Sequence, residues 1–400
     1  MQYLKELLSK SFFQDFEEVV GDHLFNFKMH DLMHDLALSM AKNECGIVDS
    51  HNHFISKKTR HLSFVEDNMI RDGVPSFLSN TYRLRTISFP HYSVTPTQSF
   101  MESCISMFPF LRFLDLSYCS IVLVPKKLGN LRHLRFLDLR GNDEIKKLPS
   151  SICKLQSLQT LMLEECEELH ELPRDIRFLI SLRYLSFTTN QKFLPHNRIE
   201  RLNSLRTLFI DSCINLEYLI EDIGDLKALR ILSINNCPNL VSLPSSIKRL
   251  SSLEDLWLQD CEKINLDWGI GTEEEGTHQD LNSARPHLRV LVLEKLPKLV
   301  MLPQWLLQCS ANTLQWLVIK GCPNLLALPD SLQNLKSLRV RHCPKVASLP
   351  QDMHGLTTLE KIEIEGCPTL SERCQQGSGE DWPQIAQVRN IRLDGHLIIK

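Results

Sequence analysis

The stretch LEDLWLQDC, residues 253–261, places apolar side chains at Leu256 and Leu258 on either side of Trp257. Such alternation is typical of a short β-strand with one buried face. The stretch follows the pattern L-x-x-[LIV]-x-[LIV]-x-x-C. The same pattern recurs at residues 111–119, 158–166, 205–213, 229–237 and 314–322.

The repeats keep a constant spacing along the chain. Their last position is a cysteine or an asparagine, and it falls at residues 119, 142, 166, 190, 213, 237 and 261, which are 23 or 24 residues apart. This spacing and pattern are the signature of leucine-rich repeats. The sequence therefore predicts an α/β leucine-rich-repeat solenoid of about a dozen repeats with a curved parallel sheet. The first certain strand is expected at 84–89 and the last at 388–393.

Two further features recur within the repeats. Leu-Pro follows most strands, as at Leu243-Pro244, and proline is expected to close the strand region because it cannot donate to a ladder. Short helical or irregular backing is expected after it. The Cys or Asn is expected inside the following bend, where it can satisfy buried carbonyl groups.

Composition excludes several classes of protein. The formal net charge is −3, which gives no general field for nucleic-acid binding. No stretch of 18 apolar residues is present, so no membrane span is expected. Charged residues interrupt the first 20 residues, unlike a signal peptide. The odd number of cysteines, 13, in a long chain favours a reducing compartment, the cytosol or the nucleus.

Eight of the 13 cysteines occupy the repeat position and are interpreted as buried, reduced structural thiols, with no metal or redox role. They are Cys119, Cys166, Cys213, Cys237, Cys261, Cys322, Cys343 and Cys367. One repeat is lengthened by an insertion within Asp267–Pro286, which contains three consecutive glutamates. It is interpreted as a tolerated surface loop, with an acidic partner-binding or inhibitory loop as the alternative.

The solvent-facing positions of the strands vary widely between repeats. Exposed aromatic and charged side chains on a rigid sheet are candidate anchors for a protein partner. The candidates are Tyr118, Arg140, Glu164, Phe209, Trp257, Asp260, Trp316 and Lys320. An arginine often follows the first leucine, as at Arg183 and Arg206, and is interpreted as a solvated column, with a basic stripe for an acidic partner as the alternative.

The first 45 residues do not follow the repeat. Residues 11–14 and 23–27 are expected to form two short strands of a hairpin, followed by a helix from about His30 to Lys42. Met33, Leu36, Ala37 and Met40 are its expected buried face, and Asp31 is its expected N-cap. His30-Asp-Leu-Met-His34 approaches the H-E-x-x-H pattern of zinc proteases, but a third ligand and a second catalytic lobe are missing from the pattern. A phosphate-sensing helix start is the alternative.

These residues carry a resemblance to a known family. Ser-Phe-Phe-Gln at 11–14, Lys-Met-His-Asp-Leu at 28–32 and Arg60-His-Leu-Ser63 resemble the end of the winged-helix (NB-ARC) subdomain and the start of the repeats in plant nucleotide-binding leucine-rich-repeat disease-resistance proteins of the coiled-coil class. The resemblance implies an MHD motif at 29–31, in which His30 and Asp31 sense ADP. It also implies an upstream nucleotide-binding domain and ADP or ATP as cofactor. The phosphate loop G-x-x-x-x-G-K-[ST] does not occur in the sequence, so no cofactor is expected on this chain itself.

The expected organisation has three parts: the end of a winged helix at 1–45, a linker and N-terminal cap at 46–83, and the repeats at 84–400. The expected function is non-enzymatic. The repeats of an intracellular immune receptor would bind a pathogen effector or a guarded host protein and restrain the nucleotide switch. The alternatives are a truncated stand-alone regulator, a ubiquitin-ligase substrate adaptor, and the H-D-x-x-H metallohydrolase.

Overall fold

The computed structural model describes the chain except residues 1–5, 8, 9, 11, 19–24, 42, 50–54, 67–73, 91–94, 195–198, 268–285, 311, 331 and 399–400. The chain divides into two compact units, Met1–Asp115 and Leu116–Lys400. Most of the insertion at Asp267–Pro286 lies outside the described residues. Among those described, no helix is long and apolar enough to cross a membrane.

The first unit opens with the expected hairpin. Strands β1 (Phe13–Glu18) and β2 (Phe25–Met29) pair in antiparallel fashion, with Phe13 opposite Met29. Helix α2 (Asp31–Ala41) follows, close to its predicted limits. The expected buried face of α2 is wrong, since none of its residues is buried and Leu36 and Met40 are 52% and 79% exposed. The apolar spacing is present, but of the four residues only Met33 is half-buried.

The parallel strands begin earlier than the sequence indicated. Strands β3 (Cys45–Val48), β4 (His61–Phe64), β5 (Thr86–Ser88) and β6 (Phe113–Asp115) pair in chain order, all parallel. The 46–83 segment, expected to be a linker and N-terminal cap, therefore contributes strands to the sheet. Helix η2 (Ser76–Asn80) and helix α3 (Gln98–Met107) accompany these strands. The rings of Phe64, Phe89 and Phe100 meet with centroids 5.2–6.2 Å apart and fill the core here.

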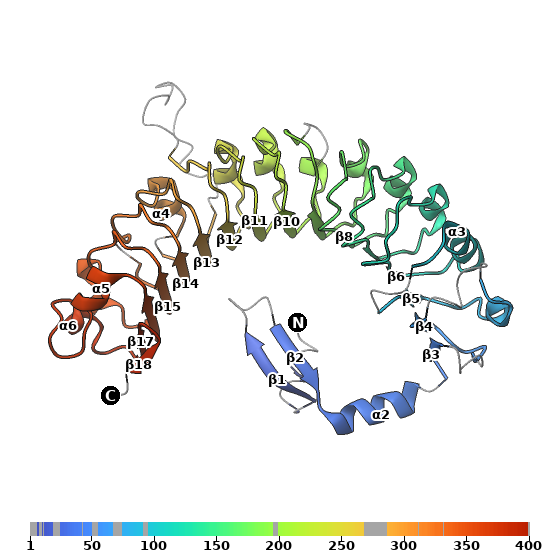
Figure 1. Ribbon diagram of the computed structural model, residues 1–400, viewed down its shortest axis with the longest axis horizontal. Helices are drawn as coiled ribbons and strands as arrows, with labels where there is room; N and C mark the ends of the chain where they lie inside the picture. The colour runs from blue at the N-terminus through green and yellow to red at the C-terminus, as the bar shows by residue number, and fades with distance from the viewer. Residues whose placement is uncertain are drawn as a thin grey trace. The chain divides into compact units, whose positions relative to one another are not determined.

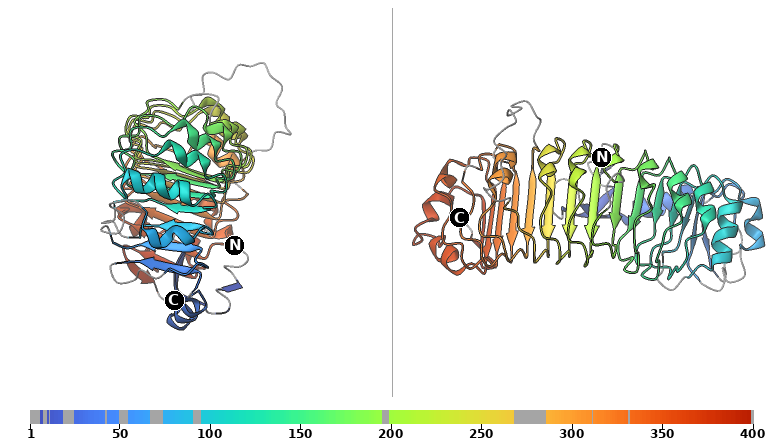
Figure 2. Two further views of the ribbon diagram at one scale, coloured as in Figure 1. Left: turned by 90° about the vertical axis from the view of Figure 1, so that its right-hand side faces the viewer. Right: turned by 90° about the horizontal axis from the view of Figure 1, so that it is seen from above.

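The second unit is a regular parallel array, drawn in Figures 1 and 2. Its strands are β7 (Phe136–Asp138), β8 (Thr160–Leu163), β9 (Tyr184–Phe187), β10 (Thr207–Asp211), β11 (Ile231–Asn235), β12 (Asp255–Gln259), β13 (Val290–Glu294), β14 (Trp316–Lys320), β15 (Ser337–Arg341), β16 (Lys361–Glu365) and β17 (Asn390–Leu393). Strand β18 (His396–Ile398) closes the array in antiparallel fashion. The predicted leucine-rich-repeat solenoid is confirmed.

Short helices back the strands of this unit. They are η3 (Lys126–Asn130), η4 (Ser150–Lys154), η5 (Ile176–Phe178), η6 (Ile199–Arg201), η7 (Glu221–Asp225), η8 (Ser245–Arg249), α4 (Gln304–Ser310), η9 (Gln351–Gly355), α5 (Pro368–Arg373) and α6 (Trp382–Ile385). A proline stands directly before several of these helices. Pro149 and Pro244 are the N-caps of η4 and η8, and their carbonyls accept the first bond of the turn, so proline starts the backing helix.

The pairing of neighbouring strands lines up one buried residue from each strand, so that these residues form a continuous column inside the array. Leu208, Leu232 and Leu256 are directly paired neighbours and are at most 1% exposed. Inward leucines are therefore covered on both sides by the adjacent repeats and from behind by the short helices. Because a solenoid repeat buries its core against its neighbours, this column carries the stability of the unit.

The residue inside each bend satisfies buried backbone groups, as expected. Asn142 Nδ2 donates to the carbonyls of Leu116 (2.9 Å) and Leu139 (2.8 Å), and its Oδ1 accepts from the amide of Ile121 (2.8 Å). Cys166 occupies the same position and bonds the Leu139 carbonyl at 3.3 Å. The eight repeat cysteines are at most 1% exposed, which confirms their predicted burial. Burial raises the pKa of Cys166 to about 12, so this thiol stays protonated near neutral pH.

Candidate protein-interaction surface

The strands of the second unit present a second face, opposite the inward leucines. We call the side chains that point from this face the outward face of β7–β17. They alternate with the inward residues, so Trp257 lies between the buried Leu256 and Leu258. Strands lie on one side of the array and the short helices on the other (Figure 1). The outward face is thus a rigid surface whose side chains vary from repeat to repeat.

Three of the predicted partner-binding residues lie close together near its start. Arg140 grips the Asp138 carboxylate through Nε (3.0 Å) and Nη2 (2.7 Å), and its Nε lies 4.0 Å from Glu164 Oε2. The Tyr118 hydroxyl donates to Glu165 at 3.0 Å. Asp138 is only 2% exposed, because Arg140 covers its carboxylate. Burial raises the pKa of Glu164, although the nearby Ser186 hydroxyl and the charge of Arg140 oppose the shift.

Aromatic side chains continue the outward face. Phe209 on β10 lies 5.7 Å from Tyr184 on β9, measured between ring centroids. The Trp316 ring on β14 carries Arg289 and Lys336 over it, at 5.9 and 5.6 Å. Trp257 and Trp316 are both half-buried, so each offers part of a ring to a partner while the rest is held by neighbours.

Two of the predicted charged residues are paired across strands. Lys320 on β14 donates to Glu294 at 2.6 Å. Asp260 follows β12 and bonds Lys295 at 2.8 Å. Its φ of 50° places Asp260 in a left-handed turn after the strand, so it borders the outward face instead of lying on it.

A left-handed residue recurs at this turn in many repeats. Glycine there makes room for the preceding repeat's side chain. A Cβ on Gly141 (φ 66°) would lie 2.1 Å from the ring of Tyr118, and one on Gly366 (φ 62°) would lie 2.4 Å from the ring of His342. Tyr118 therefore reaches Glu165 by crossing a position that holds no side chain.

Replacing Gly141 with alanine is expected to lower the free energy of unfolding by about 1–3 kcal/mol, through left-handed strain and displacement of the Tyr118 ring. In a Tyr118→Ala background the cost should fall to about 1 kcal/mol, since the strain alone remains. Gly377→Ala is the matched control, because that position has φ 79° and open space around it. Urea denaturation measures the natural chain, the two single variants, the double variant and the Gly377→Ala control. Equal costs for Gly141→Ala with and without the Tyr118 ring would contradict the steric account.

The arginines after the first leucine of the repeats form no continuous basic stripe. Glu254 occupies one of these positions, 3.5 Å from Arg230 and 3.9 Å from Arg289. This column is a mixed ladder of weak surface pairs, as the solvated-column interpretation expected.

Sequence reasoning missed the most charged group on the outward face. Glu363 on β16 is 4% exposed and lies 2.6 Å from Arg341 and 3.5 Å from Arg339 on β15. Lys361 and Arg392 lie at 3.9 and 3.8 Å. The alternation of Lys361-Ile-Glu363 and Arg339-Val-Arg341 in two adjacent repeats was the signal that could have found it.

His30 stands at the start of helix α2. His30 Nδ1 accepts the amide of Leu32 at 3.3 Å, so His30 is the N-cap of α2, and the expected cap, Asp31, is the first helical residue. A histidine whose Nδ1 accepts carries its neutral-form proton on Nε2, which leaves a donor for an oxygen ligand. His34, one turn later, is exposed and lies 3.5 Å from Asp35. Among the described residues no cluster of three or more potential metal ligands is found.

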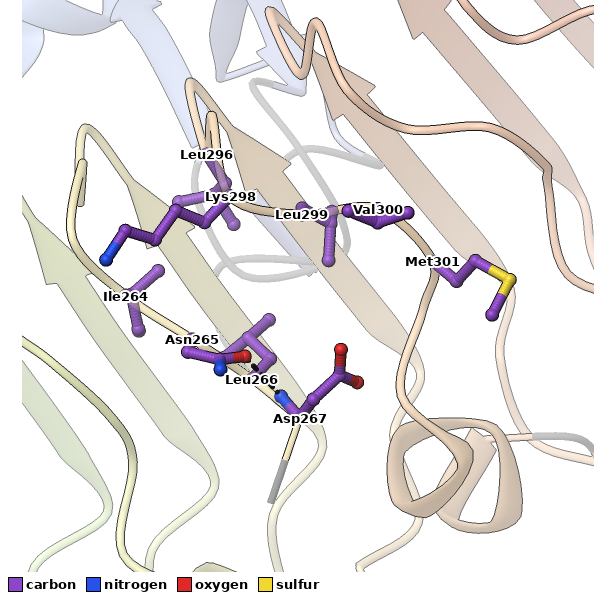
Figure 3. Close-up of a pocket in the computed structure, with 9 residues that line it drawn as sticks. All are labelled: Ile264, Asn265, Leu266, Asp267, Leu296, Lys298, Leu299, Val300 and Met301. Atoms are coloured by element: carbon purple, nitrogen blue, oxygen red, sulfur yellow. Dashed lines mark hydrogen bonds between the residues drawn. The ribbon is translucent and has the colours of Figure 1, made fainter. Parts of the chain in front are cut away.

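A small hollow lies beside the loops after β12 and β13 (Figure 3). Leu266 and Leu299 border it with Lys298, Asp267 and Met301. It holds about 10 Å³, room for one water molecule, so it is too small for a nucleotide or another cofactor.

Two parts of the chain match known protein families. Residues 91–320 match the leucine-rich repeat region family, and residues 1–37 match the winged helix domain of disease resistance proteins. A protein of Arabidopsis thaliana described as a disease resistance protein is 33% identical over 160 residues, which are 38% of this chain and 11% of that protein. The disease resistance protein RPS4 of the same plant is 29% identical over 236 residues, which are 58% of this chain and 19% of RPS4.

The chain thus spans about a fifth or less of the length of these relatives. The resemblance to the C-terminal portion of plant nucleotide-binding leucine-rich-repeat proteins, first seen at residues 11–37, is confirmed by these matches. Among solved structures, Toll in the Drosophila Toll–Spatzle complex aligns with 91% of this chain and 48% of its own, at 17% identity and a TM-score of 0.57. That likeness concerns the fold.

Proposed function

The chain belongs to the leucine-rich repeat family, and from this premise we propose that it is the recognition module of an intracellular plant immune receptor. Its outward face would bind a pathogen effector or a guarded host protein. The observation that carries the proposal is the rigid outward face itself, with half-buried aromatic rings at Phe209, Trp257 and Trp316. The winged-helix match at 1–37 and the disease-resistance relatives support the receptor context.

The inward and outward side chains of the strands differ in which residue types they tolerate. Inward side chains are restricted to apolar types because each is enclosed by neighbouring repeats. Outward side chains carry no such restriction, so their chemistry can be set by a partner without loss of the fold. Aromatic rings held by neighbouring side chains lose little conformational freedom on binding, which favours them as interface anchors.

An immune response in plant tissue tests this proposal. In a full-length receptor carrying this chain, Phe209→Ala and Trp316→Ala are expected to abolish or strongly weaken the response to the matching pathogen. Phe178→Ala is the matched control, because Phe178 lies on η5, away from the strands, and is 48% exposed. Receptor abundance must stay unchanged in all three variants. If the control loses the response while Phe209→Ala and Trp316→Ala keep it, recognition does not use the outward face.

We further propose that His30 and Asp31 couple this module to a nucleotide switch. His30 stands at the positive end of α2, where phosphate oxygens bind well, and its Nε2 can donate to a β-phosphate of ADP supplied by the upstream nucleotide-binding domain. Asp31, in the first turn, stabilises the helix that presents the imidazole ring. ADP binding would hold such a receptor in its resting state.

Asp31→Val in the full-length receptor is expected to produce a defence response without any pathogen. Without Asp31 the first turn of α2 should no longer hold the His30 ring in place. Loss of the charge-assisted bond from His30 to phosphate costs about 1.5–3 kcal/mol, which corresponds to a shift of roughly 10- to 150-fold in the resting-to-active ratio. His34→Ala is the control and should change the response much less, because that ring is exposed one turn further on. If the Asp31→Val receptor gave no response without a pathogen, the role of His30 and Asp31 would be limited to starting helix α2.

A further inference from the structure

Four cationic side chains converge on one carboxylate at the C-terminal end of the outward face. Arg339, Arg341, Lys361 and Arg392, here called the basic patch, all lie within 4.0 Å of Glu363. They come from three adjacent strands, β15, β16 and β17, whose registers place Arg339, Glu363 and Arg392 side by side. The sheet therefore holds these charges in fixed positions.

The positive charge of the basic patch exceeds the negative charge beside it. Glu363 is almost fully buried, and the second nearby acid, Glu365, pairs with Arg341 at 3.3 Å. The four cations keep between 32% and 47% of their side chains exposed, so each can still meet a ligand. Burial, followed by the charges of Arg339, Arg392 and Arg341, lowers the pKa of Lys361 despite the opposing effect of Glu363. The four cations of the basic patch outnumber the two carboxylates beside them, so they can bind further anionic groups.

Apolar surface adjoins the basic patch on the preceding strands. Trp316, Ser337 and Lys361 occupy one register row on β14, β15 and β16, so Trp316 and Lys361 lie about 10 Å apart. Val318 is half-buried beside Trp316 on the same face of β14. An aromatic and aliphatic surface is thus followed, about three extended residues away, by four cations.

We propose that the outward face of β14–β17 binds an extended acidic segment of a partner protein, with an apolar side chain against Trp316 and Val318 and carboxylates among Arg339, Lys361 and Arg392. This inference rests on the proposed recognition function and specifies the chemistry of the partner. A nucleic acid fits less well, because the patch is four cations wide and tight phosphate binding needs a longer basic track. The apolar surface beside it matches a side chain.

The test uses the full chain and a defined probe. A fluorescein-labelled peptide with one leucine, two spacer residues and four glutamates is titrated at low ionic strength and followed by anisotropy. A peptide with glutamines in place of the glutamates measures the apolar contribution. The acidic peptide is expected to bind at least 10-fold more tightly, and its affinity should fall as salt is added, because exposed ion pairs are screened.

Charge reversal locates the binding site. The double variant Arg339→Glu and Arg392→Glu is expected to weaken binding of the acidic peptide by 10-fold or more. The matched control, Lys227→Glu and Arg249→Glu, makes the same charge change at exposed residues in and beside the short helices and should alter affinity less than 2-fold. If both double variants lost the same affinity for the acidic peptide, the effect would come from the net charge of the chain and not from the basic patch, and the proposal would be overturned.

Glu363→Gln provides a test in the opposite direction. It removes the central carboxylate and leaves four cations for the ligand, so the acidic peptide should bind several-fold more tightly while the chain becomes less stable. Weaker binding of the acidic peptide would mean that the cations need Glu363 to hold them in position and do not bind a further anion, which would overturn the proposal. Tighter binding of a single-stranded RNA of equal charge would assign the patch to nucleic acid and overturn the proposal. None of these outcomes depends on a plant response, so this inference can fail while the proposed recognition function holds.

Discussion

Leu317→Ala is expected to lower the free energy of unfolding by about 2–5 kcal/mol. Leu317 is fully buried on β14, paired with Leu291 on β13 and Leu338 on β15. Its removal leaves a cavity that the neighbouring strands cannot close, because their spacing is fixed by the sheet. Equilibrium denaturation in urea measures the loss directly.

Trp316→Ala, one residue earlier, is the matched comparison. Its ring lies on the outward face, and the cations above it contribute about 0.5–1 kcal/mol each at a partly exposed site. We expect a loss of about 1–2 kcal/mol, smaller than the loss for Leu317→Ala although the substitution removes more atoms. Equal or reversed losses at the two positions would mean that the two faces of the strand have been exchanged.

Cys213→Asp is the second substitution with a large expected effect. Cys213 is fully buried, and its Sγ accepts the amide of Thr189 at 3.3 Å inside the bend. A carboxylate there would be a buried charge with no cation beside it, so the free energy of unfolding should fall by about 2–5 kcal/mol near pH 7. Part of this loss should be regained at low pH, where the new carboxyl group is neutral.

Cys45→Asp makes the same chemical change at an exposed position on β3 and should be nearly neutral. Thermal denaturation of both variants at pH 7 and pH 4 separates the burial of charge from the change in size. If Cys213→Asp proved as stable as the natural chain, the repeat cysteines would not lie in a dry interior. No disulfide joins the thirteen cysteines, all of which lie in the described part of the chain.

The repeating part of the fold could be predicted because one local rule sets it. Every repeat from β7 to β17 places an apolar residue inward at the same register, and from β7 to β12 these residues are 23 or 24 positions apart, which implies the stacking of strands. The hairpin before α2 was visible for a similar reason, since two aromatic runs flank Gly21-Asp22. Local pattern and global fold agree in both places.

The irregular start of the array was hidden because its strands break the rule. Gly46 occupies the register of Leu62, and β4 follows β3 after 16 residues, well short of a full repeat. The exposure of α2 could not be predicted either. A helical apolar stripe indicates which side chains share a face, but the presence of a packing partner depends on the rest of the fold.

The candidate site was predicted residue by residue but not as groups. Alternation identified Trp316 and Arg140 as outward, yet it could not show that Arg140 covers Asp138 or that Trp316 lies under two cations. The basic patch depends on three strands that are 20 or more residues apart in sequence, so only the register brings it together. The backbone decides that His30 and not Asp31 caps α2, since the His30 carbonyl accepts the amide of His34 at 2.9 Å.

Hydroxyl-radical footprinting tests the central claim, that the outward face is the recognition surface. The full-length receptor is oxidised alone and in complex with the protein that elicits its response, and oxidation of single side chains is read by mass spectrometry. We expect strong protection of Phe209, Trp257 and Trp316, and unchanged oxidation of Phe178 on η5. Protection of Phe178 with no change at the three outward rings would contradict the account.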